Sequence, residues 1–284
     1  MTERKNDLNG KLEKLKTYIK EQGSLAVAFS GGVDSTFLLK TAHDVLGDRC
    51  IAITARSASF PRREQEEAAA FCRDENIRQI FFDSGEMDIP AYARNRKDRC
   101  YHCKHALFSK MKEIAAAEGI PLAAEGSNMD DLGDYRPGLR AIAELEVLSP
   151  LREAGLYKDE IRILSRQMGL PTWSKQSFAC LASRFVYGEP ITPEKLRMVE
   201  EAEQMLSSLG LEQYRVRIHG TLARIELLPG DFGILLDRVI RHRIVAACRE
   251  LGFSYVTMDL QGYRTGSMNE VLSADEKKTE MLES

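Results

Sequence analysis

Short apolar runs alternate with amphipathic segments through the first two thirds of the chain. Apolar runs of this length predict strands, and apolar residues recurring every three or four positions predict helices. Strands are expected at residues 25–29, 50–55, 77–83 and 121–127, of which the last runs into a polar turn. Helices are expected at 8–22, 35–47, 62–76, 105–119 and 158–169. Because alternating strands and helices form βαβ units, the pattern predicts an α/β fold with a parallel sheet. Such a sheet binds ligands beyond the carboxyl ends of its strands.

The pattern changes near residue 190. Helices are expected at 192–210 and 238–252, and strands at 214–220, 222–229 and 254–260. This order is typical of a small α+β domain. We therefore expect a first domain over residues 1–190 and a smaller C-terminal α+β domain for substrate binding or oligomerisation over 191–270. Residues 271–284 lack an apolar pattern, which predicts a disordered tail.

Composition and charge exclude several classes of protein. The chain has 284 residues, of which 43% are hydrophobic, and a formal net charge of −3. That charge gives no overall attraction to nucleic acid. The chain has no run of about 18 apolar residues, so no membrane span is expected. Its charged start does not resemble a signal peptide, so we expect a cytoplasmic protein.

The segment "SGGVDS", residues 30–35, follows the first expected strand and predicts a phosphate site. Gly31 and Gly32 permit unusual backbone dihedrals and let the backbone approach a ligand closely. Ser30 and Ser35 offer hydroxyl donors, and the start of the following helix favours an anion. Asp34 does not attract phosphate directly, so a bridging Mg²⁺ is expected there. An ordinary strand-to-helix turn is the alternative.

Two cysteines are spaced as a C-x-x-C pair in "RCYHCK", and a third follows in "FACLASRF". Cys100, Cys103 and Cys180 could together hold one metal ion or cluster. A structural zinc site needs a fourth ligand, which His102 or His105 could supply. Three thiolates also suit a [4Fe–4S] cluster with one iron left open. The remaining cysteines are predicted to be small buried core residues: Cys50, Cys72 and Cys248.

The segment "SGGVDS" resembles the PP-loop of the ATP pyrophosphatases, which have an adenine nucleotide alpha hydrolase-like fold. The resemblance implies that ATP is cleaved between its α and β phosphates, that the loop holds pyrophosphate, and that AMP is transferred to an oxygen of the substrate. A nucleophile would then displace AMP. The resemblance leaves the identity of that nucleophile open.

Further segments occur in order between residues 125 and 226, and together they resemble the LarE family of ATP-dependent sulfur transferases, a resemblance that covers about residues 8–262. They are "EGSNMDDLGDYRPG", "SPL", "GLPTWSK", "CLASRF" and "RVRIHGTLARIE". The resemblance implies adenylation of a carboxylate of pyridinium-3,5-dicarboxylate mononucleotide, followed by replacement of AMP with sulfur. The thiocarboxylate serves synthesis of the nickel-pincer cofactor of lactate racemase. Gln176 departs from the family, which is expected to have proline at this position.

The family has two versions of the sulfur donor. In one, a single cysteine gives up its own sulfur, and Cys180 matches that position. In the other, three cysteines hold an iron–sulfur cluster that carries a sulfide. The additional pair Cys100 and Cys103 is similar to the cluster version, so a [4Fe–4S] cofactor is expected. Lys175 and Arg184 are near Cys180 in sequence and are expected to take part in catalysis by lowering its thiol pKa.

The resemblance also implies a nucleotide site. Gly126 and Asn128 are expected near the nucleotide, and Asp131 near Mg²⁺. Arg56 and Ser57 follow the second strand, where adenine contacts fall in this fold. An acidic surface turn is the alternative for residues 125–131.

Arg215 and Arg217 alternate along an expected strand, so both should project from one face as a fork for phosphate. The resemblance suggests that they bind the phosphate of the substrate, with assistance from Arg224. Glu203, on the preceding helix, could face this site. A solvent-facing basic strand is the alternative.

Rival functions are a PP-loop iron–sulfur tRNA thiolase, a glutamine-dependent ligase and a regulatory module that has lost catalysis. No aromatic-rich basic patch favours RNA binding, and no glutaminase domain is evident. The expected partners are therefore the mononucleotide, a sulfide donor that the sequence does not name, and further copies of the chain in a homo-oligomer.

Overall fold

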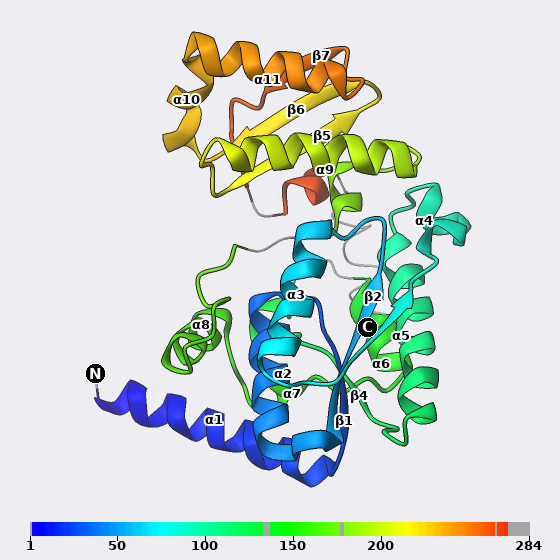
Figure 1. Ribbon diagram of the computed structural model, residues 1–284, viewed down its shortest axis with the longest axis vertical. Coiled ribbons are helices and arrows are strands. Elements are labelled where there is room, and N and C mark those ends of the chain that lie inside the picture. The colour runs from blue at the N-terminus through cyan, green and yellow to red at the C-terminus, as the bar shows by residue number, and fades with distance from the viewer. Residues whose placement is uncertain (1, 133–136, 177–178, 265, 272–284) are drawn as a thin grey trace.

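The computed structural model describes residues 2–132, 137–176, 179–264 and 266–271 (Figure 1). Of the expected disordered tail, residues 271–284, all but residue 271 lie outside these ranges. Two sheets are present, one in each half of the chain. The second sheet and its helices lie beyond the carboxyl ends of the strands of the first sheet (Figure 1).

The first sheet is fully parallel, as the sequence predicted. Its strand order is β3-β2-β1-β4. The strands are β1 (Leu25–Ala28), β2 (Cys50–Arg56), β3 (Gln79–Asp83) and β4 (Ala123–Ala124). The chain runs outward from β1 to β3 and then returns to place β4 on the other side of β1. The switch point, where ligands bind in such sheets, is therefore between β1 and β4.

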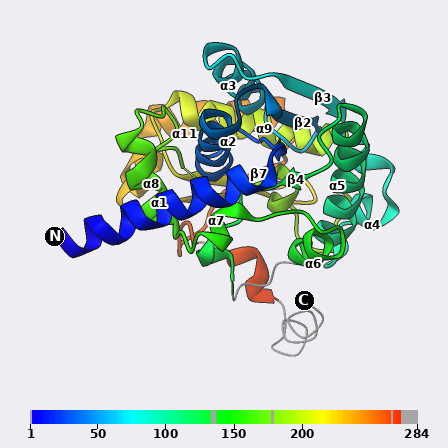
Figure 2. The same cartoon turned by 90° about the horizontal axis from the view of Figure 1, so that it is seen from below.

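Helices cover both faces of this sheet and make three layers (Figure 2). One face packs on α1 (Thr2–Gln22), α2 (Val33–Leu46), α3 (Arg62–Asp74), α7 (Pro150–Glu153) and α8 (Lys158–Gln167). The other packs on α5 (Arg99–Ala117) and α6 (Gly138–Glu144). Alternate residues of β1 supply the two cores, with Leu25 and Val27 in one and Ala26 in the other. Burial on both faces explains the continuous apolar runs of the strands.

The second sheet has the order β5-β6-β7. Strands β5 (Tyr214–His219) and β6 (Leu222–Leu227) are antiparallel, and β7 (Tyr255–Met258) is parallel to β6. One face packs on α9 (Pro193–Ser208) and α11 (Arg238–Glu250), with the short α10 (Phe232–Leu236) between β6 and α11. The core of this layer also takes Tyr92, Leu181 and Phe185 from before residue 190. The two halves therefore share buried side chains.

Several elements differ from the expected ranges. The strand expected at 121–127 is only two residues long, because the chain turns at Glu125 into a polar loop. The helix expected at 105–119 begins six residues earlier, at Arg99, and so includes Cys100 and Cys103. The short α4 (Pro90–Ala93) was not expected from the sequence. Within the described ranges no helix is both long and apolar enough to cross a membrane.

Candidate active site

The "SGGVDS" loop connects β1 to α2 at the switch point of the first sheet. Gly31 has φ +67°, and a Cβ there would lie 3.0 Å from the Cβ of Ala68 on α3. A side chain is therefore excluded by both backbone conformation and space. Gly32 is the N-cap of α2, and Ser35 Oγ lies 3.1 Å from Ser30 Oγ and 3.2 Å from Gly32 O. The two hydroxyls and the first amides of α2 thus surround one small region, which suits an anion.

The loop after β4 packs directly against the start of α2. Gly126 has no room for a side chain, because a Cβ would lie 3.1 Å from the backbone nitrogen of Ser35. Asn128 Nδ2 donates to Asp34 Oδ1 at 3.3 Å, and Asp131 Oδ2 accepts from Asn128 N at 2.9 Å. The structure therefore brings Gly126, Asn128 and Asp34 together, with Asp131 fixing the loop that carries Asn128.

Lys158, the first residue of α8, forms an ion pair with Asp34. This lysine does not stand out in the sequence, since it is 124 positions from Asp34 along the chain. The carboxylate of Asp34 therefore faces Lys158 on one oxygen and Asn128 on the other. A cation that binds Asp34 would take the place of the lysine.

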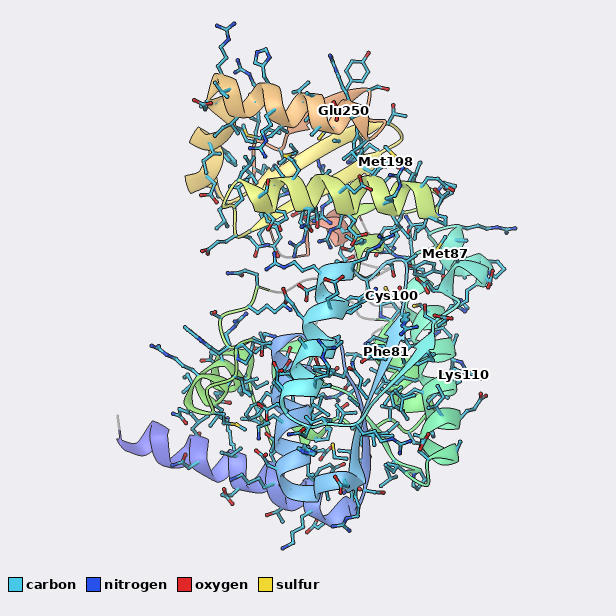
Figure 3. All side chains as sticks on the ribbon, viewed as in Figure 1. Phe81, Met87, Cys100, Lys110, Met198 and Glu250 are labelled. Carbon is cyan, nitrogen blue, oxygen red and sulfur yellow. The ribbon has the colours of Figure 1, made fainter. Side chains whose placement is uncertain are left out.

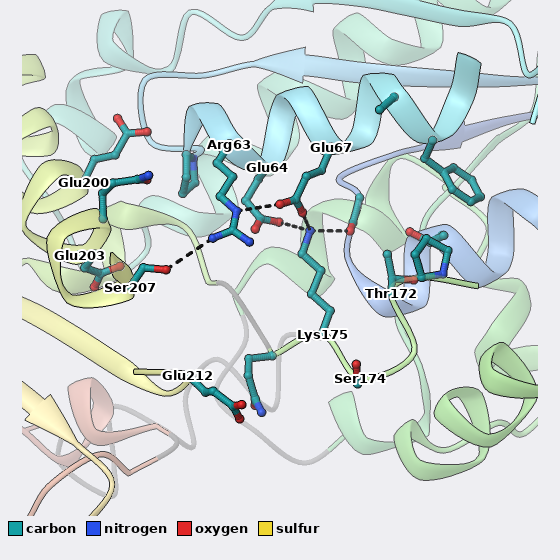
Figure 4. Close-up of a pocket in the computed structure, with 18 of the residues that line it drawn as sticks. Arg63, Glu64, Glu67, Thr172, Ser174, Lys175, Glu200, Glu203, Ser207 and Glu212 are labelled. Atoms are coloured by element: carbon teal, nitrogen blue, oxygen red, sulfur yellow. Dashed lines mark hydrogen bonds and ion pairs between the residues drawn. The ribbon is translucent and has the colours of Figure 1, made fainter. Parts of the chain in front are cut away.

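Lys175 points toward the loop and an acidic pair on α3 (Figure 4). Its Nζ lies 3.2 Å from Gly31 O, 2.6 Å from Glu64 Oε2 and 2.7 Å from Glu67 Oε2. Glu64 is 5% exposed, and burial raises its pKa above the ordinary value while Lys175 opposes that change. Lys175 is thus a half-buried cation held at the edge of the "SGGVDS" loop.

A cavity of about 680 Å³ lies beside this lysine, between α3 and α9 (Figure 4). Its lining includes Gly31 of the loop, Arg63 of α3, Gln176, and Tyr214 at the start of β5. It also contains several carboxylates: Glu64, Glu67, Glu200, Glu203 and Glu212. A cavity of this size is large enough for a nucleotide-sized ligand.

Arg56 and Ser57 line a second cavity of about 570 Å³ at the carboxyl end of β2. The Arg56 guanidinium lies 4.8 Å from the centre of the Phe81 ring. Ser57 Oγ donates to Glu86 Oε1 at 2.5 Å, and Glu86 is buried. Arg56 is thus held at the wall of a cavity beyond a strand end, where the fold places ligands.

The three cysteines of the sequence analysis approach one another where the two halves meet. Cys100 and Cys103 lie on the first turns of α5, and Cys100 marks the end of that helix nearest the second sheet (Figure 3). Cys180 directly precedes the short 3-10 turn η4 (Leu181–Arg184). Cys100 and Cys180 are exposed, and Cys103 is half-buried. The pKa of the Cys103 thiol is raised by burial and then by the charges of Cys180 and Cys100.

Tyr92 on α4 lies beside these thiols and was missed by the sequence analysis. Its hydroxyl is 3.8 Å from Cys180 Sγ, and its side chain is 2% exposed. Its pKa is raised by burial first and by Cys180 next. In the described part of the chain, no three His, Cys, Asp or Glu side chains surround a point that would hold a single metal ion. The thiols are near enough to influence one another but are not closed around one ion.

Arg184 fixes the backbone that carries Cys180. Its guanidinium is fully buried and forms two 2.8 Å hydrogen bonds with Glu203 of α9. Its remaining Nη1 donates to the carbonyl oxygens of Ala179 at 2.7 Å and Cys180 at 3.3 Å. This geometry holds the cysteine segment in place and keeps the Arg184 head group away from solvent.

Arg215 and Arg217 lie on the face of β5 that is turned away from α9 and toward η4. Arg217 forms a double hydrogen bond with Glu226 of β6, at 3.0 and 2.9 Å, and donates to Ser183 O at 2.7 Å. Arg215 is 4% exposed and lies over the Tyr263 ring at 5.1 Å. Burial, and then the positive charge of Arg184, lowers the pKa of Arg215 to about 10.

Arg224 of β6 joins this group, because its Nη2 donates to Glu226 Oε1 at 3.0 Å. Glu226 is completely buried and accepts from Arg217 and Arg224 at once. Neither Glu226 nor its role in orienting the two arginines was anticipated from the sequence. An alternating R-x-E pattern on β6, opposite the R-x-R pattern of β5, is the signal that could have found it.

Known proteins resemble this chain over most of its length, although no protein-family model matches it. An uncharacterized protein of Synechocystis sp. is 43% identical over 266 residues, which cover 94% of this chain and 99% of that protein. The pyridinium-3,5-bisthiocarboxylic acid mononucleotide synthase of Lactiplantibacillus plantarum is 38% identical over 261 residues, covering 90% and 92%. A glutamine-hydrolyzing GMP synthase of Pyrococcus furiosus is 29% identical in one of its subunits over 209 residues, covering 66% of each chain.

Proposed function

Because the chain belongs to the family of pyridinium-3,5-bisthiocarboxylic acid mononucleotide synthases, we propose that it is an ATP-dependent sulfur transferase. Its substrate is pyridinium-3,5-dicarboxylate mononucleotide. A carboxylate oxygen of the substrate attacks the α-phosphorus of ATP, and pyrophosphate leaves. A sulfur nucleophile then attacks the activated acyl carbon, and AMP leaves with the electrons of the carbon–oxygen bond. The product is a thiocarboxylate for synthesis of a nickel-pincer cofactor.

The loop at the switch point serves the first step in this proposal. Ser30, Gly31, Gly32 and Ser35 bind the β- and γ-phosphates through hydroxyls and the amides of α2. Lys175 supports this role, since its ammonium already contacts the loop at Gly31 O. If Lys175 moved from Glu64 and Glu67 to the phosphates of ATP, its positive charge would lie where negative charge develops during the reaction.

Asp34 would hold Mg²⁺ in place of Lys158. Magnesium bound with a nucleotide commonly uses one or two carboxylates plus phosphate oxygens and water, so a single carboxylate at the loop fits that donor set. Asn128 orients the carboxylate, and Asp131 fixes Asn128. In the same proposal Arg56 and Ser57 contact the adenine side of ATP in the cavity at the end of β2.

The sulfur donor is assigned to the cysteine group. Three thiols that influence one another, two of them exposed, fit a [4Fe–4S] cluster held by Cys100, Cys103 and Cys180. When bound, such a cluster supplies a sulfide as the nucleophile. Tyr92 and Arg184 hold Cys180 in position, the first through its hydroxyl and the second through the backbone. Direct transfer of the Cys180 sulfur is the second candidate, favoured by the exposure of that thiol.

One observation carries the proposal. The segment 179–183 bears Cys180 at one end, and its Ser183 carbonyl accepts a 2.7 Å hydrogen bond from Arg217 at the other. The sulfur site and the candidate phosphate site are therefore held on one short segment. A mononucleotide whose phosphate contacts Arg215 and Arg217 would extend toward Cys180.

Anaerobic protein, reconstituted with iron and sulfide and mixed with ATP and the dicarboxylate mononucleotide, tests the proposal. AMP and a thiocarboxylate should appear together by mass spectrometry, with about four irons per chain. C100A and C103A should lose the iron, whereas C72A, a buried cysteine elsewhere, should retain it. Loss of one sulfur from Cys180 per product, without iron, would favour the second candidate. Absence of AMP with any substrate would contradict the proposed enzyme.

The second half of the chain carries a candidate surface for oligomerisation. Large apolar side chains are exposed near the second sheet: Leu228, Leu236, Val239, Tyr255 and Leu260. We propose that they contact a second copy of the chain, which light scattering would detect as a mass above 32.0 kDa. We also propose a domain boundary near residue 190, between the elements of the first sheet and those of the second.

A further inference from the structure

Arg99, the first residue of α5, is a buried arginine to which the proposed reaction assigns no role. Its side chain is 2% exposed, and its Nη1 has no hydrogen-bond partner within the described residues. Its Nη2 lies 3.5 Å from Ala182 O and 3.4 Å from Met268 Sδ, and its guanidinium is 4.9 Å from the Tyr187 ring centre. No ion pair among the described residues involves Arg99, so none of these neighbours neutralises its charge.

A buried guanidinium without a carboxylate is costly, because removing a charge from water requires compensation. Arg184 and Arg217 show how this chain otherwise meets that cost, since each forms a double hydrogen bond with a buried glutamate. Arg99 has instead a carbonyl oxygen at the limit of hydrogen bonding, a thioether and a ring face. An anionic ligand would supply the missing compensation.

Arg99 and Arg217 contact the same two short segments. Arg217 donates to Ser183 O at 2.7 Å and to Ser267 Oγ at 3.0 Å. Arg99 contacts Ala182, which precedes Ser183, and Met268, which follows Ser267. The two guanidiniums are therefore held between the same two turns, η4 and η6 (Ser267–Val271). Two adjacent guanidiniums form a strong site for phosphate.

Three side chains from residues 263, 267 and 268 contact these arginines and carry no charge. Tyr263 lies over Arg215, Ser267 accepts from Arg217, and Met268 contacts Arg99. A phosphate oxygen would make stronger, charge-assisted hydrogen bonds with the same guanidiniums than a ring, a hydroxyl or a thioether does. These three side chains are therefore neutral occupants that an anion can displace.

We propose that Arg99 is a further ligand of the substrate's phosphate monoester, beside Arg217, and that Met268 occupies its place until the ligand binds. The inference rests on the proposed function for the identity of the phosphate. It also connects the two ends of the site, because Arg99 directly precedes Cys100. The residue that binds the phosphate and a residue proposed to hold the sulfur donor thus share the first turn of α5.

Thermal unfolding of the full chain, with inorganic phosphate and with nicotinic acid mononucleotide as probes, tests the proposal. R99M should have a melting temperature at or above that of the wild type without ligand, because it removes an uncompensated buried charge. Phosphate and the mononucleotide should bind R99M about ten- to a hundredfold more weakly, as expected for loss of a charged hydrogen bond. The matched control R264M changes a more exposed arginine that pairs with Glu270, and should bind both probes like the wild type.

M268E tests the same site without altering Arg99. The new carboxylate should pair with Arg99, raise the melting temperature without ligand, and weaken phosphate binding. Unchanged phosphate affinity in both R99M and M268E would overturn the proposal, as would a loss of AMP binding in R99M with mononucleotide binding intact. These measurements need no turnover. If R99M binds the probes weakly but the wild-type chain forms no thiocarboxylate, the role of Arg99 in binding phosphate stands and only the proposed function is contradicted.

Discussion

Arg184 and Glu203 form a buried ion pair with two hydrogen bonds, in which Nε and Nη2 each lie 2.8 Å from a carboxylate oxygen. Glu203 Oε1 also accepts from the backbone nitrogen of Val216 at 2.9 Å. The pair therefore joins the Cys180 segment, α9 and β5. It is one of the contacts through which the second half of the chain fixes the Cys180 segment.

Replacing Arg184 with methionine should lower the free energy of unfolding by about 3–5 kcal/mol, because Glu203 is left as an uncompensated buried charge. Urea unfolding measures this. The control R197M breaks an exposed pair with Glu201 and should cost about 1 kcal/mol or less. The double variant R184M/E203M should recover most of the loss. Equal costs for R184M and R197M would show that the buried pair has no special role in stability.

Gly126→Ala should destabilise the protein by about 1–3 kcal/mol and weaken ATP binding, because the added Cβ would meet the backbone at Ser35 and push the start of α2. Calorimetry and ATP titration measure the two effects. Gly10→Ala is the matched control, since Gly10 is exposed on α1 with nothing within 4 Å. It should stabilise by about 0.5–1 kcal/mol. Wild-type ATP affinity in G126A would show that the loop after β4 does not take part in nucleotide binding.

Lys175→Met should reduce ATP–pyrophosphate exchange by about 10²–10³-fold, the typical effect of removing one donor that stabilises developing charge. The comparison is Lys40→Met, on the helix that follows the loop. Lys40 pairs with Asp44 and Glu75 rather than with loop carbonyls, so exchange should be unchanged. If both variants keep wild-type exchange, Lys175 only stabilises Glu64 and Glu67.

His219 should make stability depend on pH. Burial first, and then the charge of Arg224, lowers its pKa below the ordinary value of about 6.5. Below that pH the unfolded chain binds more protons at this histidine than the folded one, so its contribution to the unfolding free energy falls as pH falls. H219Q should flatten the stability profile just below about pH 6.5. H242Q, at an exposed position of α11, should leave the profile unchanged.

The candidate site could be predicted best where its residues are contiguous in the chain. Ser30 to Ser35 are contiguous, and the residue types that make an anion site also end a strand and begin a helix there. The parallel sheet, the second smaller sheet and the family followed from patterns of the same kind. The polar turn expected within "PLAAEGS" is present, but the strand before it is shorter than expected, because only Ala123 and Ala124 pair with β1.

Pairings between distant residues could not be predicted. Lys158 meets Asp34 only because α8 returns to the loop, and Arg184 meets Glu203 only because α9 crosses the cysteine segment. Arg99, Tyr92 and Lys158 have no motif of their own. Their importance lies in burial and in neighbours contributed by other elements, which depend on the complete fold.

The shared core has a consequence for the cooperativity of the molecule. Tyr92, Leu181 and Phe185 belong by sequence to the first half but are buried beneath the second sheet. Unfolding the second sheet alone would expose these side chains and free the backbone of Cys180. The two halves are therefore coupled thermodynamically, and the chain should melt in one transition rather than two. A separated C-terminal fragment beginning after residue 190 would lack part of its own core.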